Sequence, residues 1–559
     1  MSNLDHDRSG GCCLPSQEAI EGVPPGAVVP SFLAGSLPVG TAAAGIGNPA
    51  LAATPNPTPA PTPIPEPVYG TSCVLNLAGS PGGLSLASAS IVCTGPGAPV
   101  PITGSAALAS FANSFQGVTF VQDTDPDDTG LVLGFENLPG NVSVDNSLFD
   151  SLPGFVIVSN SSMRFTNATF RQGNTNGAGA IRVTAGAAML VEQSVFDSNL
   201  GPTGGAITLD GASSIIIQES SFSGNNAANS QGGALALSED SVCSMSNSTM
   251  QGNTAARGAG IYIVNSTLTV EACNFSSNAA RSTGGAIFVD SGSQSNITAC
   301  NFTLNTAGQS GGAVAQADSV SLVAGSVFSS NSGSTQGGAL FQSNMTGSVT
   351  ACRFVNNTGM TGAAMYQNIG NISVVDVVFD SNVATGSGGG LYQNSFAGSV
   401  QNCTFTNNRV GGSGGGLFQN TFRGDVSTCV FNTNSARTGG AIYQNAATGM
   451  TSNSVFTGNG AEKGGAIYQN NCQDANIVSC TFTNNTAQQG PVLYLNNSVP
   501  NITGSTFNGS MSAANQVFDN SVTSPSAEGS ADGTLTGGNA PSDAAGDDPS
   551  GSTDINVGT

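Results

Sequence analysis

Hydrophobic and polar positions follow a long, regular period along most of this chain. The period has two marks: a small-residue triplet followed by an aliphatic residue, and a phenylalanine followed three residues later by asparagine. The first mark lies at Gly204–Ile207, Gly232–Leu235, Gly258–Ile261, Gly284–Ile287, Gly311–Val314, Gly337–Leu340, Gly362–Met365, Gly388–Leu391, Gly414–Leu417, Gly439–Ile442 and Gly464–Ile467. The second begins at Phe196, Phe222, Met250 (in place of Phe), Phe275, Phe302, Phe328, Phe354, Phe379, Phe405, Phe431, Phe456 and Phe482. Successive marks are 25 to 28 residues apart, so one unit holds about 26 residues.

The residues between the marks favour short strands over helices. Gly, Ser, Asn, Thr and Val dominate, glycine alone accounts for 76 of 559 residues, and charged residues make up 8%. This composition is typical of short strands separated by tight turns. Three strands and three turns fit one unit, and parallel stacking of such units predicts an all-β solenoid with a shared core. The 13 steps from Phe170 to Phe507, at ~4.8 Å each, predict a rod of roughly 60 Å.

Composition divides the chain into four parts. Residues 1–70 are rich in Pro, Ala and Gly and predict a disordered linker that ends in a polyproline-like spacer. Residues 71–169 predict irregular coils that cap the solenoid, and residues 170–510 predict the regular array. Residues 511–559 are acidic and rich in Ser and Gly, which predicts a disordered tail.

Strand alternation gives each residue after the glycines a direction. The aliphatic residue faces the core, the next residue faces outward, the second faces inward and the third outward. The second position is mostly aliphatic early in the array and then becomes a run of glutamines, which predicts a ladder of buried amides. An internal polar channel is the alternative interpretation. The glutamines are Gln316, Gln342, Gln367, Gln393, Gln419, Gln444 and Gln469.

The outward positions form the main candidate binding face. An aromatic residue follows the core aliphatic residue, and an asparagine follows two residues later, in coil after coil. An exposed column of both predicts binding of a linear polysaccharide, whose sugars stack on rings and bond to amides, or of a surface protein. The alternative is that the aromatic residues only stabilise neighbouring strands under a covering turn. The candidates are Tyr366, Tyr392, Phe418, Tyr443, Tyr468, Tyr494, Asn368, Asn394, Asn420, Asn445 and Asn470.

The remaining repeated positions predict a structural role. Asparagine tolerates a left-handed backbone, so the asparagine after each repeat phenylalanine is expected at a sharp corner, with stacked side chains bonding to each other. The paired glycines are expected at turns or where two backbones approach closely.

The paired signatures GGA[ILV] and FxxN resemble the repeats of chlamydial polymorphic outer-membrane proteins. The resemblance covers roughly Phe170 to Phe507 and implies a right-handed, single-stranded parallel β-helix, similar to the pectin-lyase superfamily. Proteins with such repeats include adhesins and other surface proteins, which implies a structural or adhesive role. The superfamily also implies an alternative, a polysaccharide lyase or glycoside hydrolase.

Residues suited to catalysis do not cluster in the repeat pattern. The only histidine is His6, the only lysine is Lys463, and acidic residues mostly occupy different positions within the coil. No general acid–base pair follows, so we assign no catalytic residue and favour a non-catalytic protein over an enzyme. The net charge of −22 disfavours nucleic-acid binding, and no stretch has the length and apolarity of a transmembrane segment.

No cofactor is predicted. One acidic segment is a candidate calcium loop, but it lacks a suitably spaced glutamate and contains a proline, so an ordinary polar loop is favoured. Its carboxylates are Asp123, Asp125, Asp127 and Asp128. No C-x-x-C pair is present, which disfavours a zinc site.

Eight of the twelve cysteines fall into two groups. Cys73 and Cys93 precede the main array and are the candidate disulfide. Six others lie two residues before a repeat phenylalanine, where other units carry serine or valine, which predicts small buried side chains. They are Cys273, Cys300, Cys352, Cys403, Cys429 and Cys480.

Several features predict an extracellular, cell-surface or cell-wall protein. The Pro-rich spacer resembles the stalks of cell-wall proteins, and sixteen N-x-[ST] sequons are present. No signal peptide is evident, which indicates a truncated start or an unusual export route. Candidate glycosylation sites are Asn141, Asn160, Asn247, Asn265, Asn296, Asn344, Asn371 and Asn501.

Overall fold

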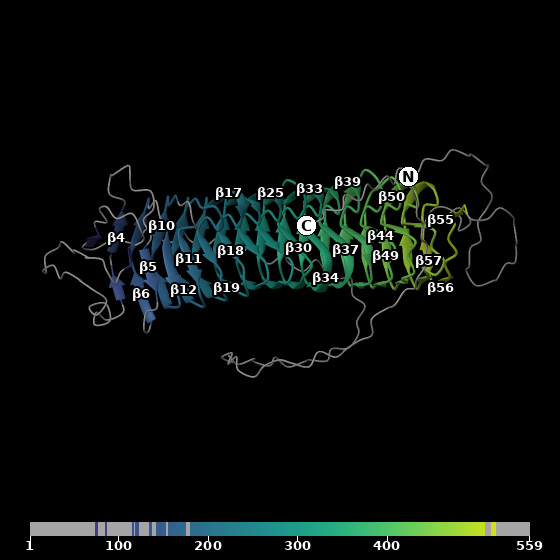
Figure 1. Cartoon of the computed structure of the whole chain (residues 1–559). Coiled ribbons are helices and arrows are strands. Elements are labelled where there is room, and N and C mark those ends of the chain that lie inside the picture. Colours follow the sequence, from purple (N-terminus) through teal and green to yellow (C-terminus); the bar gives the residue numbers. More distant parts are fainter. Residues whose placement is uncertain are drawn as a thin grey trace, which may run out of the picture. The chain divides into compact units, whose positions relative to one another are not determined.

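The structure is a computed structural model of the chain. It describes residues 73–75, 84–85, 114–116, 118–121, 133–136, 141–151, 155–174, 179–508 and 516–520, and before residue 141 it gives strands without side chains. The described residues form strands and turns with no helix, wound into about fourteen coils of about 26 residues (Figure 1). Every described strand pairs in parallel with a strand one coil away; the pairs are mostly in register, and four of them contain a register shift. The predicted β-solenoid is therefore confirmed.

Sheet A is the side of the solenoid that carries the repeat phenylalanines. Its strands have a buried central residue and two less buried neighbours, because side chains alternate across a strand. The strands are β1 Cys73–Leu75, β4 Val118–Val121, β7 Leu148–Asp150, β10 Thr169–Arg171, β13 Val195–Asp197, β16 Ser221–Ser223, β20 Thr249–Gln251, β24 Asn274–Ser276, β28 Asn301–Thr303, β32 Val327–Ser329, β35 Arg353–Val355, β38 Val378–Asp380, β42 Thr404–Thr406, β46 Val430–Asn432, β49 Val455–Thr457, β53 Thr481–Thr483 and β57 Thr506–Asn508.

Sheet C follows sheet A around each coil and leads to the paired glycines. It is β17 Asn226–Gln231, β21 Thr254–Arg257, β25 Ala279–Thr283, β29 Thr306–Ala307, β33 Ser332–Gln336, β36 Thr358–Thr361, β39 Val383–Ser387 and β43 Arg409–Val410. A separate pair continues this side as β50 Gly460–Lys463 and β54 Thr486–Gln489.

Sheet B is the longest side and consists of two strand columns. Each column contributes its own strand to a coil, so most coils carry more strands than the three predicted from the sequence. The column that begins after the glycines is β2 Leu84–Ser85, β5 Leu133–Glu136, β8 Val156–Ser159, β11 Ile181–Thr184, β14 Ile207–Leu209, β18 Leu235–Leu237, β22 Ile261–Ile263, β26 Ile287–Val289, β30 Val314–Ala317, β34 Leu340–Thr350, β37 Met365–Val375, β40 Leu391–Phe396, β44 Leu417–Asn420, β47 Ile442–Asn445, β51 Ile467–Asn470, β55 Leu493–Asn496 and β58 Val517–Asp519. The second column is β3 Ser114–Gln116, β6 Asn141–Asp145, β9 Ser162–Thr166, β12 Ala188–Glu192, β15 Ser214–Gln218, β19 Val242–Ser246, β23 Thr267–Glu271, β27 Gln294–Thr298, β31 Val320–Ala324, β41 Val400–Gln401, β45 Val426–Ser427, β48 Thr451–Ser452, β52 Ile477–Val478 and β56 Ile502–Thr503, and β34 and β37 span both columns.

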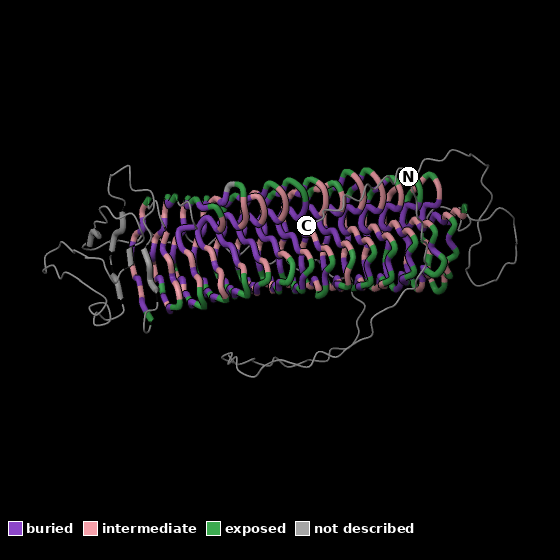
Figure 2. The backbone as a smooth tube through the Cα atoms, in the orientation of Figure 1, coloured by how far each residue is buried: buried purple, intermediate pink, exposed green. Residues whose placement is uncertain are grey.

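The core is one continuous cluster along the rod, visible as the inner row of buried residues (Figure 2). Phenylalanine rings of successive coils stack face to face inside it, with 4.7 Å between the ring centroids of Phe405 and Phe431 and 3° between their planes. Stacked aromatic pairs contribute about 0.5–1.5 kcal/mol beyond their buried area. The repeat phenylalanine is therefore both the core residue and the contact that keeps neighbouring coils in register.

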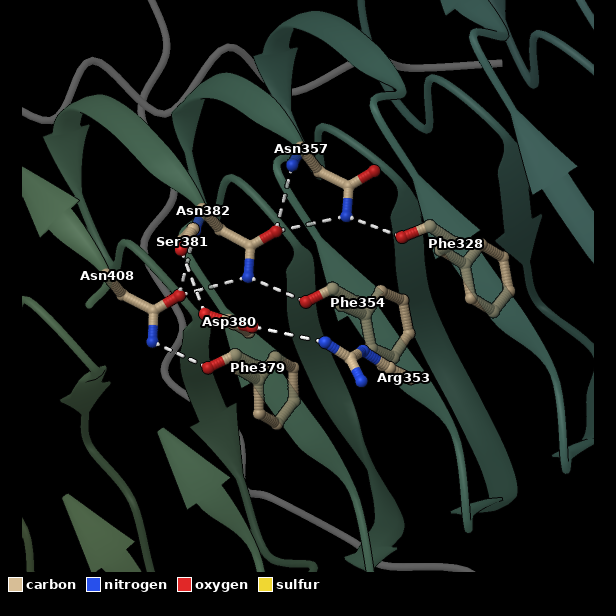
Figure 3. A network of polar contacts seen from close by, with 9 residues as sticks. All are labelled: Phe328, Arg353, Phe354, Asn357, Phe379, Asp380, Ser381, Asn382 and Asn408. Atoms are coloured by element: carbon tan, nitrogen blue, oxygen red, sulfur yellow. Dashed lines mark hydrogen bonds and ion pairs between the residues drawn. The ribbon is translucent and has the colours of Figure 1, made fainter. Parts of the chain in front are cut away.

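The asparagine after each phenylalanine is buried and bonds to both neighbouring coils (Figure 3). Asn382 donates from Nδ2 to Oδ1 of Asn408 (3.0 Å) and to the backbone carbonyl of Phe354 (3.0 Å). The predicted bonding between stacked asparagines is confirmed. The predicted left-handed backbone is wrong by one residue, because the positive φ belongs to the preceding residue, such as Ser381 (φ 57°). Asparagine is selected here for its side-chain hydrogen bonds.

The two glycines of each pair have different roles. Gly439 has a φ of 62°, in the left-handed region that glycine adopts most easily. Gly440 faces the next coil so closely that a Cβ there would lie 2.3 Å from the carbonyl oxygen of Gly465. Both predicted roles, a turn and a close backbone approach, are therefore confirmed within one dipeptide.

The array extends past both ends of residues 170–510. Phe149 stacks on Phe170 with 4.1 Å between ring centroids, and β4 pairs with β7. At the other end β58 pairs with β55 inside the segment expected to be a disordered tail. The predicted linker, residues 1–70, lies outside the described residues. Within the described residues no helix is long and apolar enough to cross a membrane.

Candidate ligand-binding face

The aromatic residues that follow the core aliphatic position lie in one column on sheet B. Eight rings stack without interruption, with 4.5 to 5.6 Å between successive centroids and at most 17° between planes. We call them the aromatic column: Phe341, Tyr366, Tyr392, Phe418, Tyr443, Tyr468, Tyr494 and Phe518. Each ring between the two end rings has a neighbouring ring on both faces, so its faces are covered along the rod.

The aromatic column is less exposed than strand alternation predicts. Tyr366 (5%) and Tyr494 (4%) are buried, while Tyr392, Phe418, Tyr443 and Tyr468 are half-buried. The backbone turn before the strand causes part of this burial, since the glycine before each strand lies directly against the ring residue. The expectation of a fully exposed column is therefore wrong, and a sugar ring finds no free aromatic face to stack on between the two end rings.

An amide column runs beside the rings, two residues further along each strand. Asn394 donates from Nδ2 to Oδ1 of Asn368 at 2.8 Å, and the same bond recurs coil by coil at 2.6 to 2.9 Å. The amide column is Asn368, Asn394, Asn420, Asn445, Asn470, Asn496 and Asn520. All but the exposed Asn520 are half-buried. A side-chain amide has two N–H donors and two lone pairs, so each inner asparagine keeps one of each beyond the column itself.

The glutamines predicted to form a buried ladder lie on the inner face of the same strands. Gln393 donates to Gln367 at 2.8 Å and accepts from Gln419 at 3.0 Å, and all seven glutamines are buried. The first, Gln316, donates to the hydroxyls of Ser295 and Ser321. The amide-ladder prediction is confirmed, and these bonds hold the strands of the face at a fixed spacing.

Among the described residues, two cationic side chains lie over rings at the outward aromatic positions of sheet B. Arg257 lies over the ring of Phe288 (5.9 Å from the guanidinium carbon) and Lys463 over the ring of Tyr494 (5.4 Å from Nζ). Burial raises the pKa of Tyr494 above its ordinary value. The segment between these two contacts therefore presents uncharged aromatic and amide groups.

The repeat cysteines are buried in the core and unpaired. Burial raises the pKa of the Cys480 thiol to about 11 and that of Cys352 to about 12. In the adjacent pair, the Cys300 Sγ donates to the Thr298 carbonyl at 3.1 Å, and its pKa is raised by burial and by Cys273. The prediction of small buried side chains is confirmed, and these protonated thiols are unreactive in the folded protein.

Other predicted site residues belong to neither column or lie outside the described residues. Seven glycosylation candidates are exposed, while Asn296 is half-buried. The calcium candidates Asp123, Asp125, Asp127 and Asp128 lie outside the described residues, as does Cys93. Cys73 begins β1, but its side chain is not described. Those predictions therefore remain predictions.

Five ion pairs lie within the described coils. Arg171 lies 2.8 Å from Asp150 and holds the pKa of that carboxyl below its usual value, although burial acts in the opposite direction. Arg182 and Asp210 form a similar contact at 2.8 Å. Within the described residues no group of three or more His, Cys, Asp or Glu side chains could hold a metal ion.

Comparisons with known proteins bear on the fold. The family described as "Right handed beta helix region" matches residues 136–280 and 232–397. The described array is a right-handed parallel β-helix. The family described as "Chlamydia polymorphic membrane protein (Chlamydia_PMP) repeat" matches residues 453–470, which lie within this β-helix and contain one aromatic–amide strand. The resemblance seen in the repeat signatures is therefore confirmed.

Whole-protein comparisons add little to the β-helix assignment. No curated protein matches the chain. Among solved structures, a mutant tailspike protein of E. coli bacteriophage HK620 in complex with a pentasaccharide is 10% identical, covers 74% of this chain and 75% of that chain, and has a TM-score of 0.20. A TM-score this low supports no argument about this chain.

The last residue of each column, Phe518 and Asn520, was missed in the prediction from the sequence. Phe518 stacks on Tyr494 (4.8 Å between centroids), and Asn520 donates to Asn496 (2.9 Å), so both columns continue past residue 510. The signal was present, since Val517–Asn520 repeats the order aliphatic, aromatic, any residue, asparagine. It was hidden because no glycine pair precedes it and the flanking composition is that of the tail.

Proposed function

We propose that this protein is a non-catalytic rod of the cell surface or extracellular space that binds an elongated polysaccharide. The ligand would lie along the aromatic–amide face, which we define as the aromatic and amide columns together. The observation that carries the proposal is the unbroken repetition of both columns over the coils from Tyr366 to Asn496. A surface repeated at one fixed spacing suits a ligand that is itself a repeated chain.

The stacked geometry changes how such a ligand would be held. Since neighbouring rings cover each other's faces, the ligand would contact ring edges and bond to the amide column. Each amide is fixed by its neighbour, as in the 2.7 Å bond from Asn420 to Asn394. A fixed donor loses little conformational freedom on binding, which favours affinity.

Three further observations support a non-catalytic surface role. The ion pairs and buried thiols account for the perturbed pKa values of acids and cysteines in the described coils. A thiol with a raised pKa stays protonated at neutral pH, and since the thiolate is the nucleophile, these cysteines supply none. Seven of the eight candidate glycosylation sites are exposed, which agrees with an extracellular or cell-wall location and a glycoprotein.

The test is a screen of the full chain against soluble polysaccharides, with released fragments measured in the same wells. The screen includes the variant Asn394→Leu/Asn445→Leu, which removes two amides and leaves the ring stack in place. We expect the parent protein to bind at least one polysaccharide without releasing fragments, and we expect the variant to bind at least about tenfold more weakly.

The matched control is Asn432→Leu, an outward asparagine in β46 on sheet A of the same rod, which should bind like the parent. Released fragments would show an enzyme, and equal binding by parent and variant would place the ligand elsewhere. Binding of a surface protein in place of any polysaccharide would also overturn the proposal.

A further inference from the structure

The charge pattern around the aromatic–amide face narrows the class of ligand. The members of the aromatic column from Tyr366 to Tyr468 and of the amide column from Asn368 to Asn470 are all Tyr, Phe or Asn, and none of these side chains is charged at neutral pH. A third outward position follows each asparagine at the exposed corner, where every residue has a positive φ near 50°. These corner residues are also uncharged: Ile369, Ser395, Thr421, Ala446, Asn471 and Asn497.

The opposite border of the aromatic column is the turn before the glycines. It carries Thr361, Ser387, Ser413 and Thr438, and the Ser413 and Thr438 hydroxyls lie 2.7 Å apart. The first charges on this border are Arg437 and Glu462, which face each other at 3.4 Å, followed by Lys463 over the ring of Tyr494. The cations of this border are therefore confined to its C-terminal end.

Charges beyond the corner residues are of both signs. Arg423 and Asp425 follow the corner at Thr421, and Asp474 follows the corner at Asn471; all three are exposed. Over the whole chain the net charge is −22, so no excess of cations compensates elsewhere.

We infer that the aromatic–amide face selects a neutral, unbranched polysaccharide and rejects acidic ones such as uronates. This inference rests on the proposed function and specifies its ligand. An acidic polysaccharide would place one carboxylate after another along aromatic, amide and corner positions that carry no cation from Tyr366 to Asn497, on a strongly anionic protein. A neutral polysaccharide meets no electrostatic repulsion there, and its hydroxyls form hydrogen bonds with the uncharged amides. Side branches would meet the corner residues that flank the amide column.

The test compares the full chain's binding of a soluble neutral glucan and mannan with its binding of polygalacturonate by affinity electrophoresis. We expect a neutral polysaccharide to bind at least about tenfold more tightly than polygalacturonate. Raising the salt concentration should leave neutral binding unchanged, because no charge takes part in it. The variant Ser395→Lys/Thr421→Lys should gain polygalacturonate binding by at least about tenfold.

The matched control is Asn356→Lys/Asn484→Lys, which places two lysines at exposed corners of sheet A with the same positive φ. It should not gain polygalacturonate binding, and circular dichroism would verify that both variants are folded. Equal or tighter polygalacturonate binding by the parent would overturn this inference and leave the proposed function standing. Identical behaviour of the two lysine variants would overturn it as well. Binding of neither class would overturn the inference and the proposed function together.

Discussion

At the scale of single residues, the buried asparagine after each phenylalanine does more than the sequence pattern predicts. Asn408 accepts from the backbone N–H and the Nδ2 of Asn382, and it donates to Asn434 and to the Phe379 carbonyl. Three consecutive coils therefore depend on one side chain. Since all these groups are buried, losing the side chain leaves several of them without a partner.

We predict that Asn408→Ala lowers the free energy of unfolding by about 3 kcal/mol or more. The neighbouring corner residue supplies the control: Asn407 is exposed with a φ of 54°, so Asn407→Gly keeps the turn and should change stability by less than about 1 kcal/mol. Urea unfolding measured by circular dichroism gives both values. Equal midpoints for the two variants would contradict the assigned role of the buried asparagine.

At the scale of elements, each ladder depends on its uninterrupted length. Gln393 lies in the middle of the glutamine ladder, whereas Gln469 is the last member and has Leu495 as its neighbour in the next coil. The Oε1 of Gln469 is buried and has no hydrogen-bond partner among the described residues. The C-terminal end of the glutamine ladder is therefore already imperfect, whereas its interior is fully paired.

We predict that Gln393→Leu destabilises the protein by about 2–4 kcal/mol, because it leaves a donor on Gln419 and an acceptor on Gln367 unpaired in the core. Gln469→Leu leaves acceptors on Gln444 and Ala475 unpaired, but it should cost about 1–2 kcal/mol less, since it also removes an oxygen that had no partner. Thermal and urea unfolding of both variants would measure the difference. A larger cost at the end of the ladder would show that the bonds between glutamines contribute little.

The elements also show how far the sequence alone could lead. The repeat, the inward glutamines and the glycine roles follow from period and alternation, because those rules act within one coil. The covered ring faces of Tyr392 and Tyr443 do not follow, since they depend on the distance between coils. Alternation says that a ring points outward but not that its neighbours occupy its two faces. The left-handed corner at Ser381 was assigned to Asn382 because asparagine is the usual residue there.

At the scale of the whole molecule, stability is a sum over coils and their contacts. Each described coil pairs only with the coils before and after it, as expected for a quasi-one-dimensional protein. Neighbouring coils pair equivalent residues: Ile442 pairs with Ile467, Tyr443 with Tyr468 and Asn445 with Asn470. A change that preserves register should therefore be tolerated better than a smaller change that breaks it.

We predict that deleting the 25 residues 440–464 gives a folded protein with one coil fewer. The deletion joins Gly439 to Gly465, so Phe418 would stack on Tyr468 and Asn420 would bond to Asn470. Deleting the 13 residues 440–452 removes less sequence but places the following strands out of register. Circular dichroism and thermal unfolding should show a cooperative β-rich protein for the longer deletion and loss of structure for the shorter one. The reverse order would contradict coil-by-coil assembly.

The heptapeptide GGAIYQN, present at residues 439–445 and 464–470, has a consequence at the level of the gene. Two copies 25 residues apart correspond to coding segments 75 nucleotides apart, a multiple of three. Unequal exchange between them would add or remove one complete coil in frame, with both glycines and both columns intact. The rod can thus change its length, and with it the number of aromatic and amide positions on its face, in single genetic steps. The length of the aromatic–amide face would then evolve through the number of coils, while the sequence within each coil stays the same.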